Sequence, residues 1–401
     1  MVVFFILLSI AIGYALCFAT AGLLSRDKSL SGLANRSQRF ISLDGLRGFL
    51  ALGVFYHHVV MTGIFIETGV SERPVVDVFQ NLGKVSVALF FIITGFLFYG
   101  KLLSAKTAEV WLKLYESRLF RILPLYLFAL LLILSFILAP KGFSLDIELR
   151  TFVKELIAWL AFHGETINGD PAAKTVISGV DWSLRYEWLF YALLPSLALM
   201  SRYRFMIISL VLLTILGNLN PTWLLSFNTK YFLFFAIGGL ARIQYKQFPI
   251  ETESMNSLWG NGITLLLILV VLSYPQTFDL IHSSLIGLLF LCFVNGNHLG
   301  GLLKKTPALI LGEISYSIYL MHGVLLYIIF HANDFIPGLG LDWVTSIMLG
   351  VLASPLLILF CFTTFRFIEW PALTKARNYP ITSFLLYRLQ NEKNTNSVIA
   401  E

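Results

Sequence analysis

Long apolar runs alternate with short polar stretches along almost the whole chain. A helix that crosses a bilayer needs about 20 mostly apolar residues. By that rule the pattern predicts about eleven spanning helices. They lie near residues 2–24, 45–64, 84–103, 121–139, 182–200, 204–220, 228–244, 258–274, 279–296, 307–330 and 343–368. The expected fold class is therefore all-α, a polytopic bundle of membrane helices.

Composition agrees with this pattern and excludes an ordinary soluble protein. The 401 residues are 57% hydrophobic and only 13% charged, with a mean hydropathy of +0.78. The isoelectric point near 9.1 would suggest a nucleic-acid partner in a soluble protein. In a membrane protein it indicates basic loops on the cytoplasmic side. We therefore expect the lipid bilayer, and no nucleic acid, as a partner.

The first apolar run, "MVVFFILLSIAIGYALCFATAGLL", differs from a cleaved signal peptide. It lacks a basic segment at its start, and its apolar stretch is too long. We interpret it as a retained spanning helix.

The Lys and Arg residues orient the bundle. With the N-terminus outside and the C-terminus in the cytoplasm, most of the 29 basic residues fall in cytoplasmic loops. The external loop "HANDFIPGLGLD" contains no base. We expect a multi-pass membrane protein in this orientation.

The longest external segment, 140–181, contains "IELRTFVKELIAWLAFHG". This stretch has helical periodicity but too few apolar residues to span. It predicts a helix that lies on the membrane surface or re-enters it.

The domain organisation expected is simple. Residues 1–40 form an extra N-terminal spanning helix with a basic cytoplasmic linker, 41–375 form one membrane domain, and 376–401 form a short cytoplasmic tail. In the tail, "ITSFLLYRLQ" could lie on the inner membrane face. The sequence indicates no oligomeric state.

Three cysteines, Cys17, Cys292 and Cys361, each lie in an apolar run. None has a partner at metal-site spacing, so neither a metal site nor a disulfide framework is predicted.

Ionisable residues inside the predicted spans are the main functional signal, because charges are costly in lipid. In "SLDGLRGFLALGVFYHHVV", Arg47 and His58 are eleven residues apart. Eleven residues turn a helix by about 1100°, close to three full turns, and rise about 16 Å. Arg47 and His58 therefore share one face, whereas His57 points elsewhere. The alternative is a snorkelling arginine and a hydrogen-bonded core histidine.

Two further stretches carry weaker signals. "VALFFIITGFLFYG" contains the Thr94 hydroxyl and Gly95, which permits the close approach of another backbone or a ligand. In "YESRLFRILPLYLF", Arg118 and Arg121 are three residues apart and share a helix face. Guanidinium pairs suit phosphates, although cytoplasmic basic residues are common in any case.

A carboxylate occurs in the apolar stretch "VDWSLRYEWLFYALLP". Glu187 lies among aromatic residues and needs a partner there. That partner could be Arg185, a histidine on another helix, or a substrate hydroxyl.

The ordered motifs of the chain resemble those of the acyltransferase-3 family of bacterial membrane proteins, over about residues 41–375. The matching segments are "SLDGLRGFLALGVFYHH", "FFIITGFL" (with Thr94 in place of the usual Ser), "SRLFRILPLY", "WSLRYEWLFYALLP", "LGEISYSIYLMHGVLL" and "FRFIEWPA". The last segment supplies Glu369 and Pro371. The family core has about ten spans, so this chain adds one in front, and it has no fused esterase-like domain.

The resemblance implies O-acyl transfer, most often of acetyl, from cytoplasmic acyl-CoA to a hydroxyl of a surface carbohydrate or lipid-linked sugar. O-antigen, lipopolysaccharide and exopolysaccharide are possible acceptors. Arg47, Arg118 and Arg121 are expected to hold the CoA phosphates, and no metal is expected. His58 would be the general base or the acyl-accepting nucleophile, and Glu187 would orient or stabilise the imidazole.

A second set of residues is expected to contact substrate on the same grounds. It comprises Asp44, Thr94, Ser315, Tyr316, Tyr319 and His322. His322 could instead make only an interhelical hydrogen bond. The alternative functions are a polysaccharide or small-solute transporter, in which such charges would line a path, and a membrane scaffold.

Overall fold

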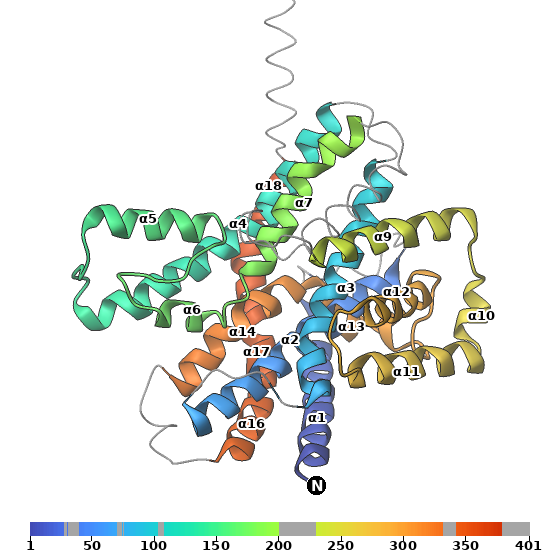
Figure 1. Ribbon diagram of the computed structural model, residues 1–401, viewed down its shortest axis with the longest axis horizontal. Helices are drawn as coiled ribbons and strands as arrows, with labels where there is room; N and C mark the ends of the chain where they lie inside the picture. The colour runs from blue at the N-terminus through green and yellow to red at the C-terminus, as the bar shows by residue number, and fades with distance from the viewer. Residues whose placement is uncertain are drawn as a thin grey trace, which may run out of the picture.

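The computed structural model describes residues 1–27, 30, 40–69, 74, 76–102, 108–199, 230–331 and 342–378. The regular structure of these residues is helical, and Figure 1 shows its arrangement. The longer helices are α1 (Val2–Leu23), α2 (Ile41–Thr68), α3 (Asp77–Leu102), α4 (Ala108–Leu138), α5 (Leu149–Leu160), α7 (Trp182–Leu199), α9 (Lys230–Gln247), α11 (Leu258–Ser273), α12 (Leu280–Val294), α14 (Ser315–Phe330), α16 (Trp343–Leu352) and α17 (Ser354–Thr364). Shorter elements are η1 (Leu24–Arg26), η2 (Ala139–Lys141), α6 (Ala172–Val176), α10 (Thr252–Asn256), η3 (Leu302–Lys304), α13 (Thr306–Glu313), the π-helix η4 (Phe365–Glu369) and α18 (Trp370–Asn378).

The predicted all-α membrane fold is confirmed. Five helical segments in the described part of the chain are long and apolar enough to cross a bilayer, and a bent helix pair makes up to six. The five are Val2–Arg26, Ile41–Thr68, Asp77–Lys101, Glu109–Lys141 and Ser354–Ala376. The expected total of about eleven is not confirmed. The expected span 204–220 and the tail segment "ITSFLLYRLQ" lie outside the described residues.

Helix α2 is central to the bundle, since it packs against α3, α13, α14 and α16. Its contact with α13 is backbone to backbone. An added Cβ at Gly48 would lie 2.8 Å from the Gly312 nitrogen, and one at Gly312 would lie 1.9 Å from the Asp44 carbonyl oxygen. The two glycines therefore let α2 and α13 approach more closely than side chains would allow.

A second close contact joins α3 to α9 and confirms the expectation for Gly95. A Cβ there would lie 2.3 Å from the carbonyl oxygen of Phe235, and one at Gly238 would lie 2.2 Å from that of Ile92. The neighbour of Gly95 is thus a helix backbone and not a ligand.

Two of the expected spans are interrupted. The expected span over 307–330 is a bent helix pair, because α13 and α14 meet at Ile314 with a bend of 68°. Breaks in spanning helices are tolerated where the freed backbone is buried in protein or lines a cavity, and Ser315 and Tyr316 after this break line one. The run 343–368 is broken at Ala353, where Pro355 at the start of α17 cannot donate a helical hydrogen bond.

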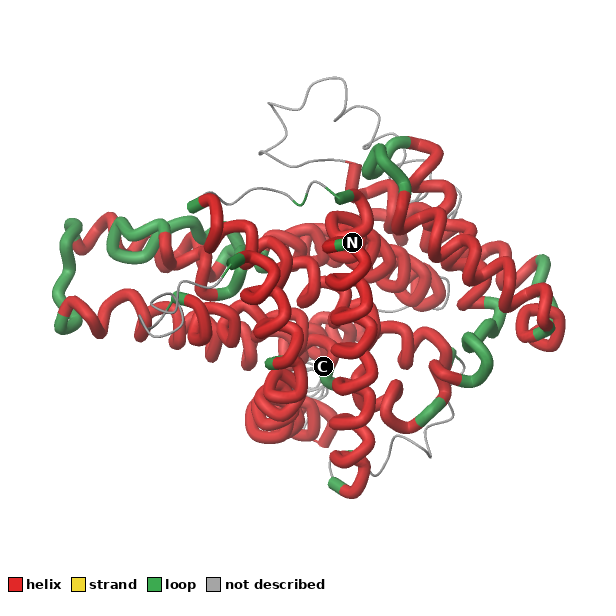
Figure 2. Tube along the Cα trace, turned by 90° about the horizontal axis from the view of Figure 1, so that it is seen from below, coloured by secondary structure: helices red, strands yellow, loops and turns green. Residues whose placement is uncertain are grey.

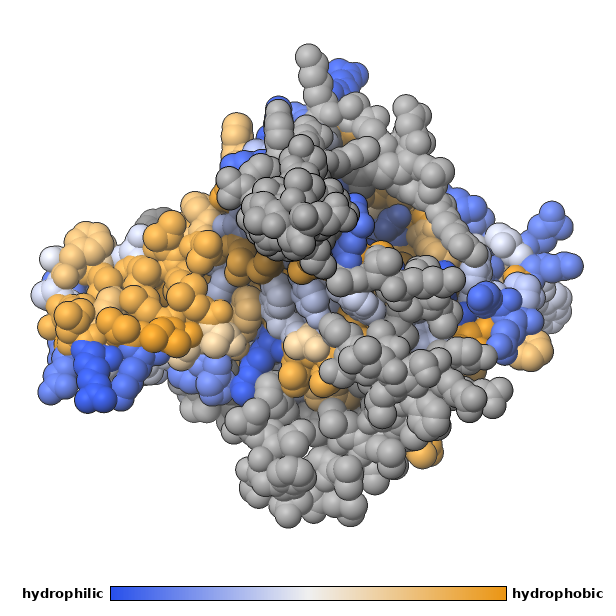
Figure 3. All heavy atoms as spheres, turned by 90° about the horizontal axis from the view of Figure 1, so that it is seen from above, coloured by the Kyte–Doolittle hydropathy of each residue, from blue (hydrophilic) through white to orange (hydrophobic). Residues whose placement is uncertain are grey.

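An arm formed by the end of α4 with α5 and α6 projects from the bundle, at the left of Figure 1. The predicted amphipathic helix is present as α5, and its 12 residues are too few to span. Its apolar side chains Leu149, Val153, Ile157 and Leu160 are exposed. Figure 3 shows apolar residues gathered over this arm above a polar edge. Figure 2, seen from below, shows the loops at the periphery of the helices.

Candidate functional site

Most of the predicted site residues line a single cavity, the arginine cavity, of about 160 Å³. α2, α3, α4, α7 and α14 all contribute to its wall. The predicted residues in this wall are Arg47, Thr94, Arg118, Arg121, Glu187, Ser315, Tyr316 and Tyr319. The tertiary structure thus brings five separate sequence motifs to one place.

The arginine cavity concentrates positive charge. Arg118 stacks over the ring of Phe98, with its guanidinium carbon 4.9 Å from the ring centroid. The Nε of Arg118 is buried and has no hydrogen-bond partner. Arg47 interacts electrostatically with both Arg121 and Arg118. A buried N–H donor among like charges provides a site for an anion.

Glu187 faces this cavity from α7. Its carboxylate accepts a hydrogen bond from Tyr191, one turn further along the same helix. Arg185, which the sequence offers as a possible partner, contacts His163 instead, at 3.0 Å. Glu187 therefore lies beside the arginines and has Tyr191 as its hydrogen-bond partner.

Three hydroxyl-bearing residues of α14 line this cavity, and they differ in whether the hydroxyl group has a hydrogen-bond partner. Tyr316 donates to the carbonyl of Ile122 at 2.9 Å, and Tyr319 donates to that of Val180 at 3.0 Å. Ser183 lies 2.7 Å from the Tyr319 hydroxyl. The Ser315 hydroxyl is buried and has no partner. The two tyrosines thus tie α14 to its neighbours, whereas Ser315 has an unused hydrogen-bonding group.

His58 and His322 are in direct contact, although they are 264 residues apart in sequence. His322 Nε2 lies 3.0 Å from His58 Nδ1, and the two rings are stacked with centroids 5.0 Å apart. His57 turns away, as the helical phase predicts, and its Nδ1 donates to the carbonyl of Phe79 at 2.9 Å. The polar partner of His58 is therefore His322, and Glu187 is bonded elsewhere.

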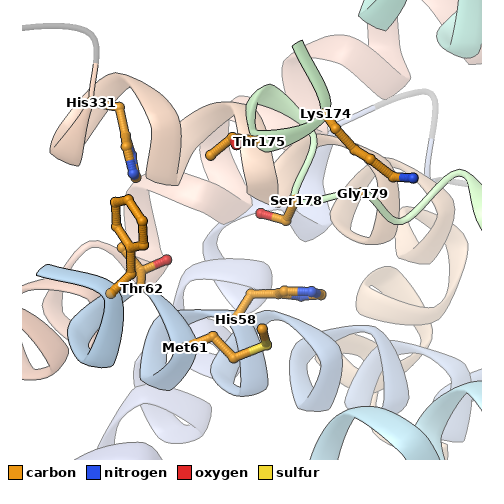
Figure 4. Close-up of a pocket in the computed structure, with 9 residues that line it drawn as sticks. His58, Met61, Thr62, Lys174, Thr175, Ser178, Gly179 and His331 are labelled. Atoms are coloured by element: carbon orange, nitrogen blue, oxygen red, sulfur yellow. The ribbon is translucent and has the colours of Figure 1, made fainter. Parts of the chain in front are cut away.

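His58 also borders a second cavity, the histidine cavity, of about 430 Å³. Its wall comes from the last turns of α2, from α6 and the residues after it, and from the end of α14 (Figure 4). The lining residues are His58, Met61, Thr62, Phe65, Lys174, Thr175, Ser178, Gly179 and His331.

His331 was not expected at a site, because it follows α14 in an apparent loop. It stacks against Tyr327 with ring centroids 5.6 Å apart, and its buried Nδ1 has no hydrogen-bond partner. Three hydroxyl-bearing residues, Thr62, Thr175 and Ser178, line the same cavity. Single hydroxyl residues in polar loops carry no functional signal in a sequence, so only the fold identifies this wall.

Side-chain contacts through the two histidines link the walls of the two cavities. His322 is fully buried, and its ring makes edge contact with that of Tyr319, which lines the arginine cavity. On the other side, His322 contacts His58, which lines the histidine cavity. One face of α2 thus contributes Arg47 to the arginine cavity and His58 to the histidine cavity.

Two further acids lie close to the arginines without lining either cavity. Asp44 interacts electrostatically with Arg47, and its carbonyl oxygen faces Gly312. Glu369, within the π-helix η4, is buried and accepts a hydrogen bond from Ser317. Asp44 thus interacts with Arg47 but does not itself line the arginine cavity, so its expected contact with substrate stays a prediction.

Comparison with known proteins agrees with the motifs. The family profile described as "Acyltransferase domain" matches residues 40–366. Over 168 residues the chain is 29% identical to Acyltransferase MdmB of Streptomyces mycarofaciens, an alignment that covers 40% of this chain and 39% of that protein. The chain thus aligns with well under half of this relative. No solved structure matches the chain. Because the profile covers most of the membrane domain, the chain belongs to the acyltransferase-3 family.

Proposed function

We propose that this protein is a membrane O-acyltransferase that moves an acetyl group from cytoplasmic acetyl-CoA to a hydroxyl of a cell-surface carbohydrate. The observation that carries the proposal is the location of His58. Its imidazole lines the histidine cavity and contacts His322, whose ring packs edge-on against Tyr319 in the wall of the arginine cavity.

The donor binds through the arginine cavity. Arg47, Arg118 and Arg121 supply guanidinium groups that pair with the phosphates of CoA. About 160 Å³ is too small for the whole cofactor, so the nucleotide stays at the cytoplasmic mouth and the pantetheine arm enters. The helix rise of about 16 Å between Arg47 and His58 is similar to the reach of that arm.

The acceptor binds in the histidine cavity on the opposite side of His58. Thr62, Thr175 and Ser178 offer hydroxyl groups, and His331 offers an unpaired ring nitrogen. Phe65 adds an apolar ring beside His331, with centroids 5.5 Å apart. Dispersed hydrogen-bonding groups around an aromatic surface suit a sugar, which has hydroxyls and apolar C–H faces.

His58 acts as the general base. As the acceptor oxygen attacks the thioester carbonyl, the imidazole takes the hydroxyl proton. The C–O bond forms, the C–S bond breaks, and the proton passes to the departing sulfur. The products are the O-acetyl sugar and free CoA, and the imidazole returns to its neutral form.

The orientation follows from the basic loops. The N-terminus lies outside a bacterial inner membrane and the C-terminus in the cytoplasm, so the histidine cavity opens outward. The arginine cavity then opens to the compartment that holds acyl-CoA.

The test uses the full-length protein in nanodiscs with radiolabelled acetyl-CoA and a crude extract of surface glycans. We expect free CoA and labelled carbohydrate in equal amounts, and neither with His58→Ala. Transport of intact glycan without CoA release would overturn the proposal. Labelling of the protein by acetyl-CoA in the absence of acceptor would show that His58 forms a covalent acyl-histidine and does not act as a general base.

A further inference from the structure

The hydrogen bonds around the two histidines determine which nitrogens carry protons. His322 Nδ1 lies 3.0 Å from the carbonyl oxygen of Ile318. His58 Nδ1 lies 3.1 Å from the carbonyl oxygen of Val54. A carbonyl oxygen can only accept, so each of these Nδ1 atoms must carry a proton.

The donor and the acceptor in the hydrogen bond between the two rings then follow. In neutral His322 the proton on Nδ1 leaves Nε2 as an acceptor. His58 Nδ1–H therefore donates to His322 Nε2 across 3.0 Å, and shares its proton with Val54. A protonated His322 would instead place two N–H groups face to face, which is repulsive.

The same argument defines the free nitrogen of His58. With its proton on Nδ1, neutral His58 has a lone pair on Nε2. That nitrogen has no hydrogen-bond partner among the described residues, and its ring lines the histidine cavity. The lone pair is thus available to a molecule in that cavity.

We propose that His322 is a positioning residue that, together with the carbonyl of Val54, holds His58 in the Nδ1–H tautomer and aims its Nε2 lone pair at the acceptor. The catalytic consequence rests on the proposed function, whereas the tautomer does not. When His58 Nε2 takes a proton, His322 Nε2 accepts from the more acidic Nδ1–H and stabilises the imidazolium.

An imidazole suits this position better than a carboxylate would. His322 is fully buried, and an ionised acid there would carry a large desolvation cost. Among the described residues, neither histidine has a carboxylate as a hydrogen-bond partner. A neutral acceptor therefore orients His58 without placing a permanent charge in the membrane interior.

The first experiment measures the tautomer directly. The full-length protein, labelled with ¹⁵N-histidine in nanodiscs, is compared by solid-state NMR with its His58→Ala and His322→Asn variants. We expect His58 to show a protonated Nδ1 and a bare Nε2. In His322→Asn we expect Nδ1 to stay protonated, because the Val54 carbonyl still accepts, and the resonance of the Nδ1 proton to move upfield as the bond to His322 is lost. A bare Nδ1 on His58 in the wild type would overturn the proposal, whatever reaction the protein performs.

The second experiment separates positioning from packing with two variants. In His322→Gln the side-chain oxygen reaches the place of Nε2 and can still accept from His58. In His322→Asn the amide reaches only the place of Nδ1, so it can bond Ile318 but not His58. Packing alone predicts similar losses in both variants.

We expect the kcat of His322→Asn to fall roughly 100-fold and that of His322→Gln by less than about tenfold, since a general base contributes roughly 10²–10⁴. The KM for acetyl-CoA should change in neither variant. Equal kcat losses in the two variants would overturn the positioning role. No activity in the wild type, with the NMR result as expected, would overturn only the proposed function.

Discussion

The two cavities along α2 differ in how they are built. The arginine cavity is smaller, about 160 Å³ against about 430 Å³, and its wall comes largely from motif residues on helices. Much of the wall of the histidine cavity comes from α6, the residues after it and the residue that ends α14. Charges on helices suit a donor with constant phosphates, whereas polar groups on connecting segments suit an acceptor recognised by its shape.

The largest expected effect is at His58, which lines the histidine cavity and contacts His322. His58→Ala should lower kcat roughly 10²–10⁴-fold, because the acceptor hydroxyl loses its base. The measurement is acetyl transfer by purified protein whose folding is checked by thermal unfolding. The matched control is His57→Ala, since His57 points at Phe79 and away from both cavities. Equal losses of kcat in the two variants would contradict the assignment of His58 as the general base.

The second prediction concerns the contact that holds the arginine end of α2. Gly312→Ala should destabilise the protein by about 1–3 kcal/mol, since the new Cβ meets the Asp44 carbonyl oxygen at 1.9 Å. The measurement is thermal unfolding in nanodiscs. Gly262→Ala on α11 is the control, because a Cβ there meets nothing within 4 Å. An unchanged melting temperature for Gly312→Ala would contradict the close packing of α2 and α13.

The third prediction tests the arginine cavity as the proposed donor site. Arg47→Lys should raise the KM for acetyl-CoA about tenfold, because an ammonium loses the bidentate grip on phosphate. The KM for the acceptor should stay constant in the same steady-state assay. Arg150→Lys, on the exposed arm helix α5, is the control for loss of a guanidinium. If the acceptor KM rose instead, the assignment of the two cavities would be reversed.

The smallest expected effect tests the acceptor cavity. Thr62→Val removes one hydroxyl and keeps the shape of the side chain, so the KM for the acceptor should rise roughly threefold to tenfold, as for one lost hydrogen bond. The KM for acetyl-CoA should not change. A changed acetyl-CoA KM with a constant acceptor KM would show that donor and acceptor do not occupy separate cavities.

Much of the arginine cavity could be predicted from the sequence. Arg47, Arg118 and Arg121 stand out because a charge within an apolar span is costly and therefore rare. Helical phase also separated His58 from His57, since both lie on the uninterrupted helix α2. Such inferences hold within one helix, because the spacing of two residues determines whether their side chains lie on the same face.

Other features depend on how helices meet, and the sequence did not predict them. The bend at Ile314 breaks an apolar run that looks continuous. The partner of His58 was sought in an acid such as Glu187, whereas the structure supplies His322. His331, set aside as a loop residue, lines the histidine cavity.

The sequence by itself determined that the chain is an all-α membrane protein, which helix faces carry its charges, and to which family it belongs. These properties follow from hydropathy, from the 3.6-residue period of a helix and from local motifs. The tertiary structure decided the contact of His58 with His322 and the separation of the two cavities. Contacts between residues 264 apart in sequence depend on how helices pack against one another, and no local sequence pattern encodes that packing.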